Sequence, residues 1–353
     1  MALVDSLNFE IDIDKEPFPF VTQMSMTAKV NAARTVTCMC SSLDGLDKVR
    51  IGAEVTIKFG RGNTIRNKDF TGIIKIINPS LDRFGFVAYD YISHLTNSEV
   101  YNFKEGDYTN QDLYMSVADA ADYKGISISK MTKGSGIKAD STMDIYGLQK
   151  RKTFIDNCMT FMVDRVSDSN HPKLSFLPYY YAIREGTSFE VFQPDHLHQY
   201  AKGDMAVSLD SATIANEGLV SSYTSMGMVN SCTVVSKDDE TLYNTYNDEG
   251  SITKYGVMSK VITYDTTRKD ILEKVGRLIV QQFNKPSMTY RVHLLGAEWL
   301  SLGSLLELKS PALKTSEILP VISYNISIQN SIETVVEVGT PSLSTDTLIR
   351  DFF

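Results

Sequence analysis

The sequence contains few of the residues and segments that mark secreted or membrane-spanning proteins. Its 353 residues include only four cysteines and one tryptophan. Four scattered cysteines do not make the dense framework of a small disulfide-stapled domain, which predicts reduced thiols in a protein made in the cytoplasm. No apolar run approaches the roughly 18 residues of a membrane span, and the first residues lack the basic and apolar regions of a secretory signal.

Positive charge is also scarce. Lysine and arginine number 35 against 43 aspartates and glutamates, which gives a formal net charge of -8 and a pI near 5.3. Domains that bind nucleic acid through their whole surface usually have a pI above about 9. The composition therefore argues against a general nucleic-acid binder, although it allows a local basic patch.

The first hundred residues are predicted to be strands. Within residues 49–59, Val55, Ile57 and Phe59 alternate with polar residues, the pattern of a strand with one solvated face. Similar strands are predicted at 70–77 and 84–90, separated by turn residues. Short strands at this spacing favour a small barrel or sandwich.

Helical periodicity appears in the middle of the chain and once near its end. The middle third is predicted to be mixed, with helices within 110–125 and 141–166 and strands within 174–192. From residue 204 the chain is predicted to be mostly β, with one helix that begins after Thr267 and ends at Asn284-Lys-Pro286. Four strands are predicted after that helix, at 289–295, 304–309, 318–328 and 332–338.

The two β-rich ends resemble each other, which indicates an internal repeat. Residues 52–59 (GAEVTIKF) align with 303–310 (GSLLELKS), and 72–76 (GIIKI) align with 320–324 (PVISY). A final apolar strand follows in each case, at 84–89 and at 334–338. The shared order of strand, loop, strand and strand predicts two related barrels.

No cluster of reactive side chains has the spacing of a known site. His196 and His198, beside Asp195, could share a cation if they lay on a strand, but no third ligand accompanies them and a polar loop explains them better. The carboxylates Glu185, Glu190 and Asp195 could supply a glycosidase pair, yet 43 carboxylates make such a pair expected by chance.

The remaining motifs have structural explanations. The cysteines Cys38, Cys40, Cys158 and Cys232 are predicted to be small apolar fillers, and residues 150–152 (KRK) a solvated helix face. Residues 179–181 (YYY) could form a stacking platform, but core packing is the commoner role. Gly60-Arg-Gly62 and Gly134-Ser-Gly136 lack the residues of a phosphate-binding loop. We therefore predict no catalytic, cofactor-binding or metal-binding residues, no cofactor and no enzymatic activity.

Several segments follow one another along the chain as a series of recognisable motifs. At the N-terminal end they are 70–74 (FTGII), 87–90 (VAYD) and 103–109 (FKEGDYT). In the second half they are 227–235 (GMVNSCTVV), 255–261 (YGVMSKV), 290–296 (YRVHLLG) and 302–308 (LGSLLEL). Taken in this order, the segments resemble the baseplate hub proteins of contractile phage tails, the late control gene D and XkdQ-like group. The lead-in to the C-terminal helix, 265–268 (DTTR), departs from the family pattern, and the middle third matches only in outline.

The resemblance implies an α+β, mainly β protein with two related tube-type β-barrel domains flanking a mixed α/β insertion. The expected boundaries are 1–105, 106–203 and 204–353. It further implies a homotrimer that joins the six-fold tail tube to the three-fold spike and surrounds a channel. The implied partners are the tail tube protein or tube initiator, the spike protein, wedge proteins and the tape measure protein. The implied location is the baseplate of the virion.

Two other interpretations stay open at this point. One is a tail-associated peptidoglycan hydrolase, and the other is the hub of a non-phage contractile injection system. In the hub interpretation the acidic composition suggests a channel lined with carboxylates, through which DNA passes without being held.

Overall fold

A computed structural model describes most of the β-rich halves and parts of the middle of the chain. The described residues are 7–61, 64–100, 113–128, 148–161, 163–165, 176–178, 180–183, 186–192, 207–209, 214–224, 227–264, 267, 269–295, 300–310, 315–329 and 332–339. No helix among them is long and apolar enough to cross a membrane. Both predicted boundaries, at 105/106 and 203/204, lie outside these ranges and stay predictions.

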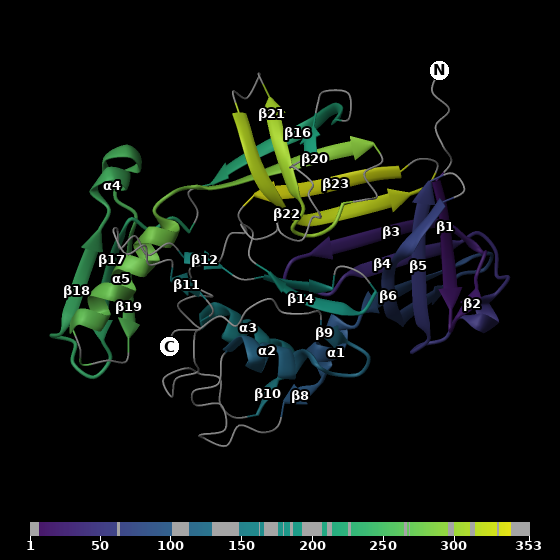
Figure 1. Cartoon of the computed structure of the whole chain (residues 1–353), viewed down its shortest axis with the longest axis horizontal. Helices are drawn as coiled ribbons and strands as arrows, with labels where there is room; N and C mark the ends of the chain where they lie inside the picture. The colour runs from purple at the N-terminus through teal and green to yellow at the C-terminus, as the bar shows by residue number, and fades with distance from the viewer. Residues whose placement is uncertain are drawn as a thin grey trace.

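A 13-stranded sheet joins the two ends of the chain (Figure 1). Its N-terminal strands are β1 (Leu7–Ile13), β2 (Glu16–Pro17), β3 (Val21–Lys29), β4 (Thr35–Cys40), β5 (Glu54–Arg61), β6 (Thr64–Pro79) and β7 (Phe84–Asp90). Its other strands are β15 (Val207–Leu209), β16 (Ile214–Thr224), β20 (Ser287–Leu295), β21 (Leu305–Ser310), β22 (Thr315–Ile328) and β23 (Ile332–Gly339). The predicted strands at 70–77, 84–90, 289–295, 304–309, 318–328 and 332–338 are thereby confirmed, with shifts at their ends.

The same five-strand arrangement occurs twice in this sheet. The N-terminal repeat has the strand order β3-β4-β7-β6-β5, and the C-terminal repeat has the order β16-β20-β23-β22-β21. The order in which the chain forms these five strands is also the same in both repeats. The predicted internal repeat is therefore confirmed in the topology.

A turn with identical hydrogen bonds fixes how the repeats align. The amide of Gly52 donates to the Ile74 carbonyl (2.9 Å), and the amide of Gly303 donates to the Val321 carbonyl (2.8 Å). Both glycines have positive φ, 90° and 79°. Ile74 is therefore equivalent to Val321, one residue away from the alignment that the sequence suggested. A shift of one residue moves side chains to the other face of a strand. The corrected alignment of the two repeats therefore changes which of their residues are equivalent on each face.

The repeats do not form two closed barrels. Among the described strands, no pairing returns the outer edge of β3 or β16 to its own repeat. The edge of β3 instead pairs with β22 of the other repeat. The chain is mainly β, as predicted, but the large antiparallel sheet is open.

The helices belong to two smaller units outside the sheet, which lie below and to the left of it in Figure 1. The middle unit contains α1 (Ile92–Asn97), α2 (Leu113–Ala121) and α3 (Arg151–Phe161) with β8 (Glu99–Val100), β9 (Ser127–Ile128), β10 (Gln149–Lys150), β11 (Val163–Arg165), β12 (Phe176–Pro178), β13 (Tyr180–Ile183) and β14 (Ser188–Phe192). The second unit contains α4 (Glu249–Tyr255) and α5 (Lys269–Phe283) with β17 (Ser231–Ser236), β18 (Tyr243–Asn247) and β19 (Ser259–Tyr264).

Each unit has its own apolar core. The sheet core combines buried residues of both repeats, including Met26, Phe86, Val292 and Ile326. A second core joins α1, α2 and α3 to β13 and β14, and a third joins α5 to β17 and β19. The predicted helix after Thr267 is confirmed as α5, which ends immediately before Asn284-Lys-Pro286.

Two predictions about the middle and the C-terminal half need correction. The helix predicted within 141–166 is confined to 151–161, because 149–150 and 163–165 pair as strands with β8 and β12. The region after residue 204 contains a second helix, α4, which Asp248 caps by accepting from the Ser251 amide (2.9 Å).

The glycine turn provides a test of the repeat. We expect Gly52→Ala and Gly303→Ala each to lower the free energy of unfolding by about 1–2 kcal/mol, because both require a left-handed backbone. Denaturant titration measures the loss. Gly250→Ala, at a glycine whose φ is not positive and whose added Cβ would meet only ordinary contact, is the control and should be nearly neutral. Equal stability of all three variants would contradict the left-handed requirement at the two turns, and a loss in only one turn variant would contradict their equivalence.

Candidate assembly interface

The two repeats are joined edge to edge, and this junction is called the seam here. It consists of the antiparallel pairing of β22 with β3, from Ser323 opposite Lys29 to Ile328 opposite Met24. The Val30 amide extends it by donating to the Ile322 carbonyl (3.0 Å). Because the backbone groups of an exposed strand edge need partners, the seam satisfies two edges at once.

On one face of the seam the side chains are polar and bonded to one another. The Asn325 Nδ2 group donates to the Thr27 hydroxyl (2.7 Å) and to the Ser25 hydroxyl (3.2 Å). The Ser327 hydroxyl in turn donates to Oδ1 of Asn325 (3.0 Å). Asn325 thus links the long strand of the C-terminal repeat to the first strand of the N-terminal repeat.

The opposite face of the seam is apolar. Tyr324 and Ile326 of β22 lie opposite Ala28 and Met26 of β3, and all four are buried in the sheet core. Burying apolar surface contributes roughly 25 cal/mol per Å². The seam therefore combines backbone pairing, a polar side-chain cluster and continuity of the core.

The polar face of the seam continues over the neighbouring strands as an uncovered face. Its hydroxyl and amide residues include Ser25, Thr27, Thr37, Thr289, Ser323 and Asn325. A hollow of about 420 Å³ indents this face where the repeats meet, and Thr27, Arg291 and Glu337 are among the residues that line it.

The charges on this uncovered face balance. Across the described parts of β3, β4, β7, β20, β22 and β23, its lysine, arginine, aspartate and glutamate residues are Lys29, Arg291, Glu333 and Glu337, two of each sign. Arg291 lies opposite Glu337 in the strand register, and the Ser323 hydroxyl donates to Oε2 of Glu337 (2.9 Å). The acidic surplus of the chain therefore does not lie on this face of these strands.

The outer edges of the sheet offer two further strand edges. Among the described strands, β16 pairs only with β20. Residues 76–79 of β6 pair with β7 on one side and with no described strand on the other. Several apolar residues lie along this second edge: Ile76 is 41% exposed, and Leu81, in the hairpin beyond it, is 98% exposed.

A buried ion pair attaches the middle unit to the N-terminal repeat. Nε of Arg34 lies 3.2 Å from Oδ2 of Asp90, and both side chains are almost completely buried. Arg34 also donates to the Gly186 carbonyl of the middle unit (3.3 Å), and Asp90 accepts from the Ile92 amide at the start of α1 (3.1 Å). Burial raises the pKa of Asp90 to about 6, although the positive charge of Arg34 opposes the shift.

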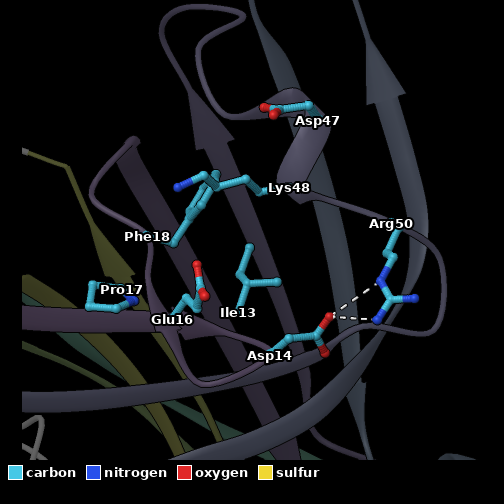
Figure 2. Close-up of a pocket in the computed structure, with 8 residues that line it drawn as sticks. All are labelled: Ile13, Asp14, Glu16, Pro17, Phe18, Asp47, Lys48 and Arg50. Atoms are coloured by element: carbon cyan, nitrogen blue, oxygen red, sulfur yellow. Dashed lines mark hydrogen bonds and ion pairs between the residues drawn. The ribbon is translucent and has the colours of Figure 1, made fainter.

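A surface pocket of about 260 Å³ lies at the far end of the N-terminal repeat, beside the β1–β2 hairpin (Figure 2). Its charged lining residues have both signs, and Asp14 pairs with Arg50 at 2.9 Å across its rim. Both partners are exposed, so this pair contributes little to stability. Nothing in the pocket has the arrangement of a catalytic or cofactor site.

Most of the candidate site residues considered from the sequence lie outside the described part of the chain. His196, His198, Glu185, Asp195, Tyr179 and Gly134-Ser-Gly136 lie outside the described residues, as does Gly62. Glu190 lies in β14, and Gly60 in β5. Among the residues that the structure describes, no group of three or more His, Cys, Asp or Glu side chains could hold a metal ion.

The cysteines and the tyrosine run have the predicted structural role. All four cysteines are free and buried. Burial raises the pKa of Cys40 and of Cys232 to about 11 and that of Cys38 and Cys158 further, so the reactive thiolate is suppressed. Tyr180 and Tyr181 are buried in cores rather than exposed for stacking.

The basic run at 150–152 is not merely a solvated helix face. Lys150 lies in β10, and the other two residues begin α3. The Arg151 guanidinium lies 4.5 Å from the centre of the Tyr123 ring and donates to the Ala120 carbonyl (3.0 Å). Arg151 therefore joins α3 to the segment around α2. The sequence patterns also did not predict the buried ion pair of Arg34 and Asp90, because no local pattern relates two residues 56 positions apart.

Comparison with known proteins rests on structure alone. No protein-family model matches the sequence, and no curated protein is significantly similar to it. A tail protein from Neisseria meningitidis MC58 has a TM-score of 0.67 at 10% identity, covering 97% of this chain and 99% of the other. The 43 kDa tail protein of prophage MuSo2 from Shewanella oneidensis has a TM-score of 0.66 at 11% identity, covering 97% and 98%.

A third structure extends the similarity to another prophage. Prophage tail protein gp18 from Listeria monocytogenes EGD-e has a TM-score of 0.57 at 9% identity, covering 97% of each chain. The chain therefore has a fold shared by prophage tail proteins, over nearly its full length. The resemblance to phage tail proteins that the sequence motifs indicated is confirmed at the level of the fold.

The buried ion pair provides a test of how the middle unit is attached. We expect Arg34→Met to lower the free energy of unfolding by about 3–5 kcal/mol, because it leaves Asp90 buried without its cation. The pKa of Asp90 would then rise further, and stability is lost as the pH rises through the pKa of the folded state. Thermal unfolding should therefore show a larger loss at pH 8 than at pH 5.

The matched control is the double variant Arg34→Met/Asp90→Asn, which removes the titrating group. Because it lacks the Asp90 titration, its stability should change less between pH 5 and pH 8 than that of Arg34→Met. A single variant whose loss does not depend on pH would contradict the assignment of the effect to Asp90.

Proposed function

We propose that the protein is a structural hub of a contractile phage tail baseplate, a trimeric adaptor between the six-fold tube and the three-fold spike. The observation that carries the proposal is the pair of equivalent repeats joined edge to edge in one chain. Three such chains present six similar units in a ring, so one face of the ring can match a six-fold partner. The three middle units and the three α4–α5 units keep three-fold symmetry and suit the spike.

The free edges support a closed ring. Among the described strands, residues 76–79 of β6 and the outer side of β16 are two different edges without a partner. An interface between two different surfaces of the same chain is head-to-tail, and such an interface generates a ring when its rotation closes. In the proposed ring the tube-type barrel wall would form only when the copies join, because no described strand closes either repeat by itself.

The uncovered face suits the wall of the central channel. In a ring of this sheet, the face that lacks a core is the one left for the lumen. Its balanced charges and hydroxyl groups replace the carboxylate lining that the acidic composition suggested. A neutral hydroxylated wall offers phosphates neither the strong attraction of a basic wall nor the repulsion of an acidic one. DNA would pass through it without specific binding.

The proposed partners follow from this role. They are two further copies of the chain, the tail tube protein or tube initiator, the spike protein, and the wedge and tape measure proteins, all within the virion baseplate. The protein would act without catalysis or cofactor. Of the three carboxylates considered for cell-wall hydrolysis only Glu190 is described, in β14, and no observation favours the hydrolase. A hub of a non-phage injection machine would have the same architecture.

The oligomeric state is the direct test. We expect the purified chain at high micromolar concentration to have three times the 39.4 kDa mass of the single chain, measured by light scattering after size exclusion. The reason is that two free strand edges and an exposed apolar margin favour association. A stable monomer, or a closed dimer, would contradict the ring.

The channel wall is tested by adding charge to it. We expect Gln23→Lys/Thr37→Lys, at two exposed positions of the uncovered face, to make the trimer bind a short linear DNA duplex in low salt. Binding should weaken steeply as salt increases, because each phosphate contact releases counterions. Electrophoretic mobility shift measures it. The control Ser41→Lys/Ser80→Lys adds the same charge at exposed positions outside this face, and equal binding by both variants would contradict the assignment of the lumen.

A further inference from the structure

We propose that residues 76–79 of β6 in one copy pair antiparallel with residues 221–224 of β16 in the next copy, with Asn78 opposite Ser222. This inference rests on the proposed trimer and names the contact that would build it. The seam inside the chain supplies the template, because it is the same pairing between the equivalent strands β22 and β3.

The register on β6 follows from an irregularity that both long strands share. The pairing of β6 with β7 shifts between Ile74 and Ile76, and the pairing of β22 with β23 shifts between Val321 and Ser323. Ile76 is therefore equivalent to Ser323. Two residues further along, Asn78 is equivalent to Asn325, the residue that links the two repeats at the seam.

The register on β16 follows from pairings across the neighbouring strands. Met26 of β3 lies opposite Val36 of β4, which lies opposite Ala88 of β7. In the other repeat Ser221 of β16 lies opposite Tyr290 of β20, which lies opposite Val338 of β23.

The two series of pairings meet at the irregularity. Ala88 lies opposite Ile74, and Val338 lies opposite Val321, which are the equivalent residues just before the shift. Position 221 on β16 therefore corresponds to Met26 on β3, and Ser222 corresponds to Thr27. Because Thr27 lies opposite Asn325, Ser222 of one copy would lie opposite Asn78 of the next.

The difference in exposure between the repeats shows that the β6 edge lacks its cover. Ile326 is completely buried against β3, whereas Pro79, at the equivalent position, is exposed. Tyr324 is 5% exposed, whereas its equivalent Ile77 is only half-buried. A neighbouring strand placed as β3 is placed would cover this margin and pair with the backbone of Ile77, whereas Pro79 has no N–H and could only accept.

The side-chain chemistry repeats as well. At the seam an asparagine amide donates to a threonine hydroxyl, Asn325 to Thr27. At the proposed contact Asn78 would lie opposite position 222 of β16, which is equivalent to the position of Thr27. Asn78 is exposed in the single chain, so its amide is accessible to a second copy. We infer that Asn78 links two chains as Asn325 links the two repeats.

Disulfide trapping tests the register. Facing residues of antiparallel strands have Cα atoms about 4.5–5.5 Å apart, within the range that a disulfide bridges. We expect Asn78→Cys/Ser222→Cys to give covalent dimers and trimers on a non-reducing gel after mild oxidation. The four native cysteines are buried, so background cross-linking should be low.

Two matched variants bracket the result. Asn325→Cys/Thr27→Cys, at the seam, should form a disulfide within one chain and leave the mass unchanged. Asn78→Cys/Tyr223→Cys shifts the pairing by one residue, which places the two thiols on opposite faces, and should cross-link at least 10-fold less. Equal cross-linking in the shifted variant would overturn the register.

A single substitution provides a measurement that does not depend on oxidation. Ile77→Asp would place a carboxylate between the two copies, at a position that in the single chain is half-buried against the sheet core. We expect the trimer to dissociate at a protein concentration at least about 100-fold higher than wild type, with unchanged circular dichroism, since an unpaired charge buried on association is strongly unfavourable.

The outcomes separate this inference from the proposed function. A trimer that forms without the 78–222 cross-link and tolerates Ile77→Asp would overturn the β6–β16 contact and leave the hub proposal standing. A chain that stays monomeric at all concentrations and never cross-links would overturn both. Specific cross-linking together with loss of the trimer in Ile77→Asp would establish the contact.

Discussion

The architecture depends on the edge-to-edge pairing of β22 with β3. The backbone groups of a strand edge need partners. Here β3, the first strand of the N-terminal repeat, pairs with β22, the long strand of the C-terminal repeat, instead of closing its own repeat into a barrel. The two repeats consequently form one sheet with a shared core. The equivalent edges, at residues 76–79 of β6 and along the outer side of β16, have no partner among the described strands.

The two smaller units are placed where they do not interrupt the sheet. The unit of α4 and α5 lies between β16 and β20, at the position of the short β3–β4 turn in the other repeat, and the middle unit lies between the repeats. The buried pair of Arg34 and Asp90 fixes the middle unit beside that turn. Additional structure can thus be carried at the connections while the strands keep a common arrangement suited to a ring.

Charge is distributed unevenly in a way that composition does not reveal. The chain has a net charge of -8, yet on the uncovered face of β3, β4, β7, β20, β22 and β23 two acidic residues balance two basic ones. If this face lines a channel, passage of DNA depends on the absence of net charge there, and the acidic surplus contributes to solubility and to contacts elsewhere. The reactivity of the cysteines is likewise decided by their local environment, because burial of all four thiols suppresses the reactive thiolate.

Alternating apolar residues determined the strands of both repeats, and the 3.6-residue period with Pro286 determined α5, because these signals depend on residues close in sequence. The sequence also contained the repeat and the family resemblance. Tertiary structure alone decided the one-residue alignment of Ile74 with Val321, the pairing of Arg34 with Asp90, and the short length of α3. It also decided that neither repeat closes on itself. Each of these depends on partners far apart in the chain, because strand pairing and burial bring together residues that no local pattern relates.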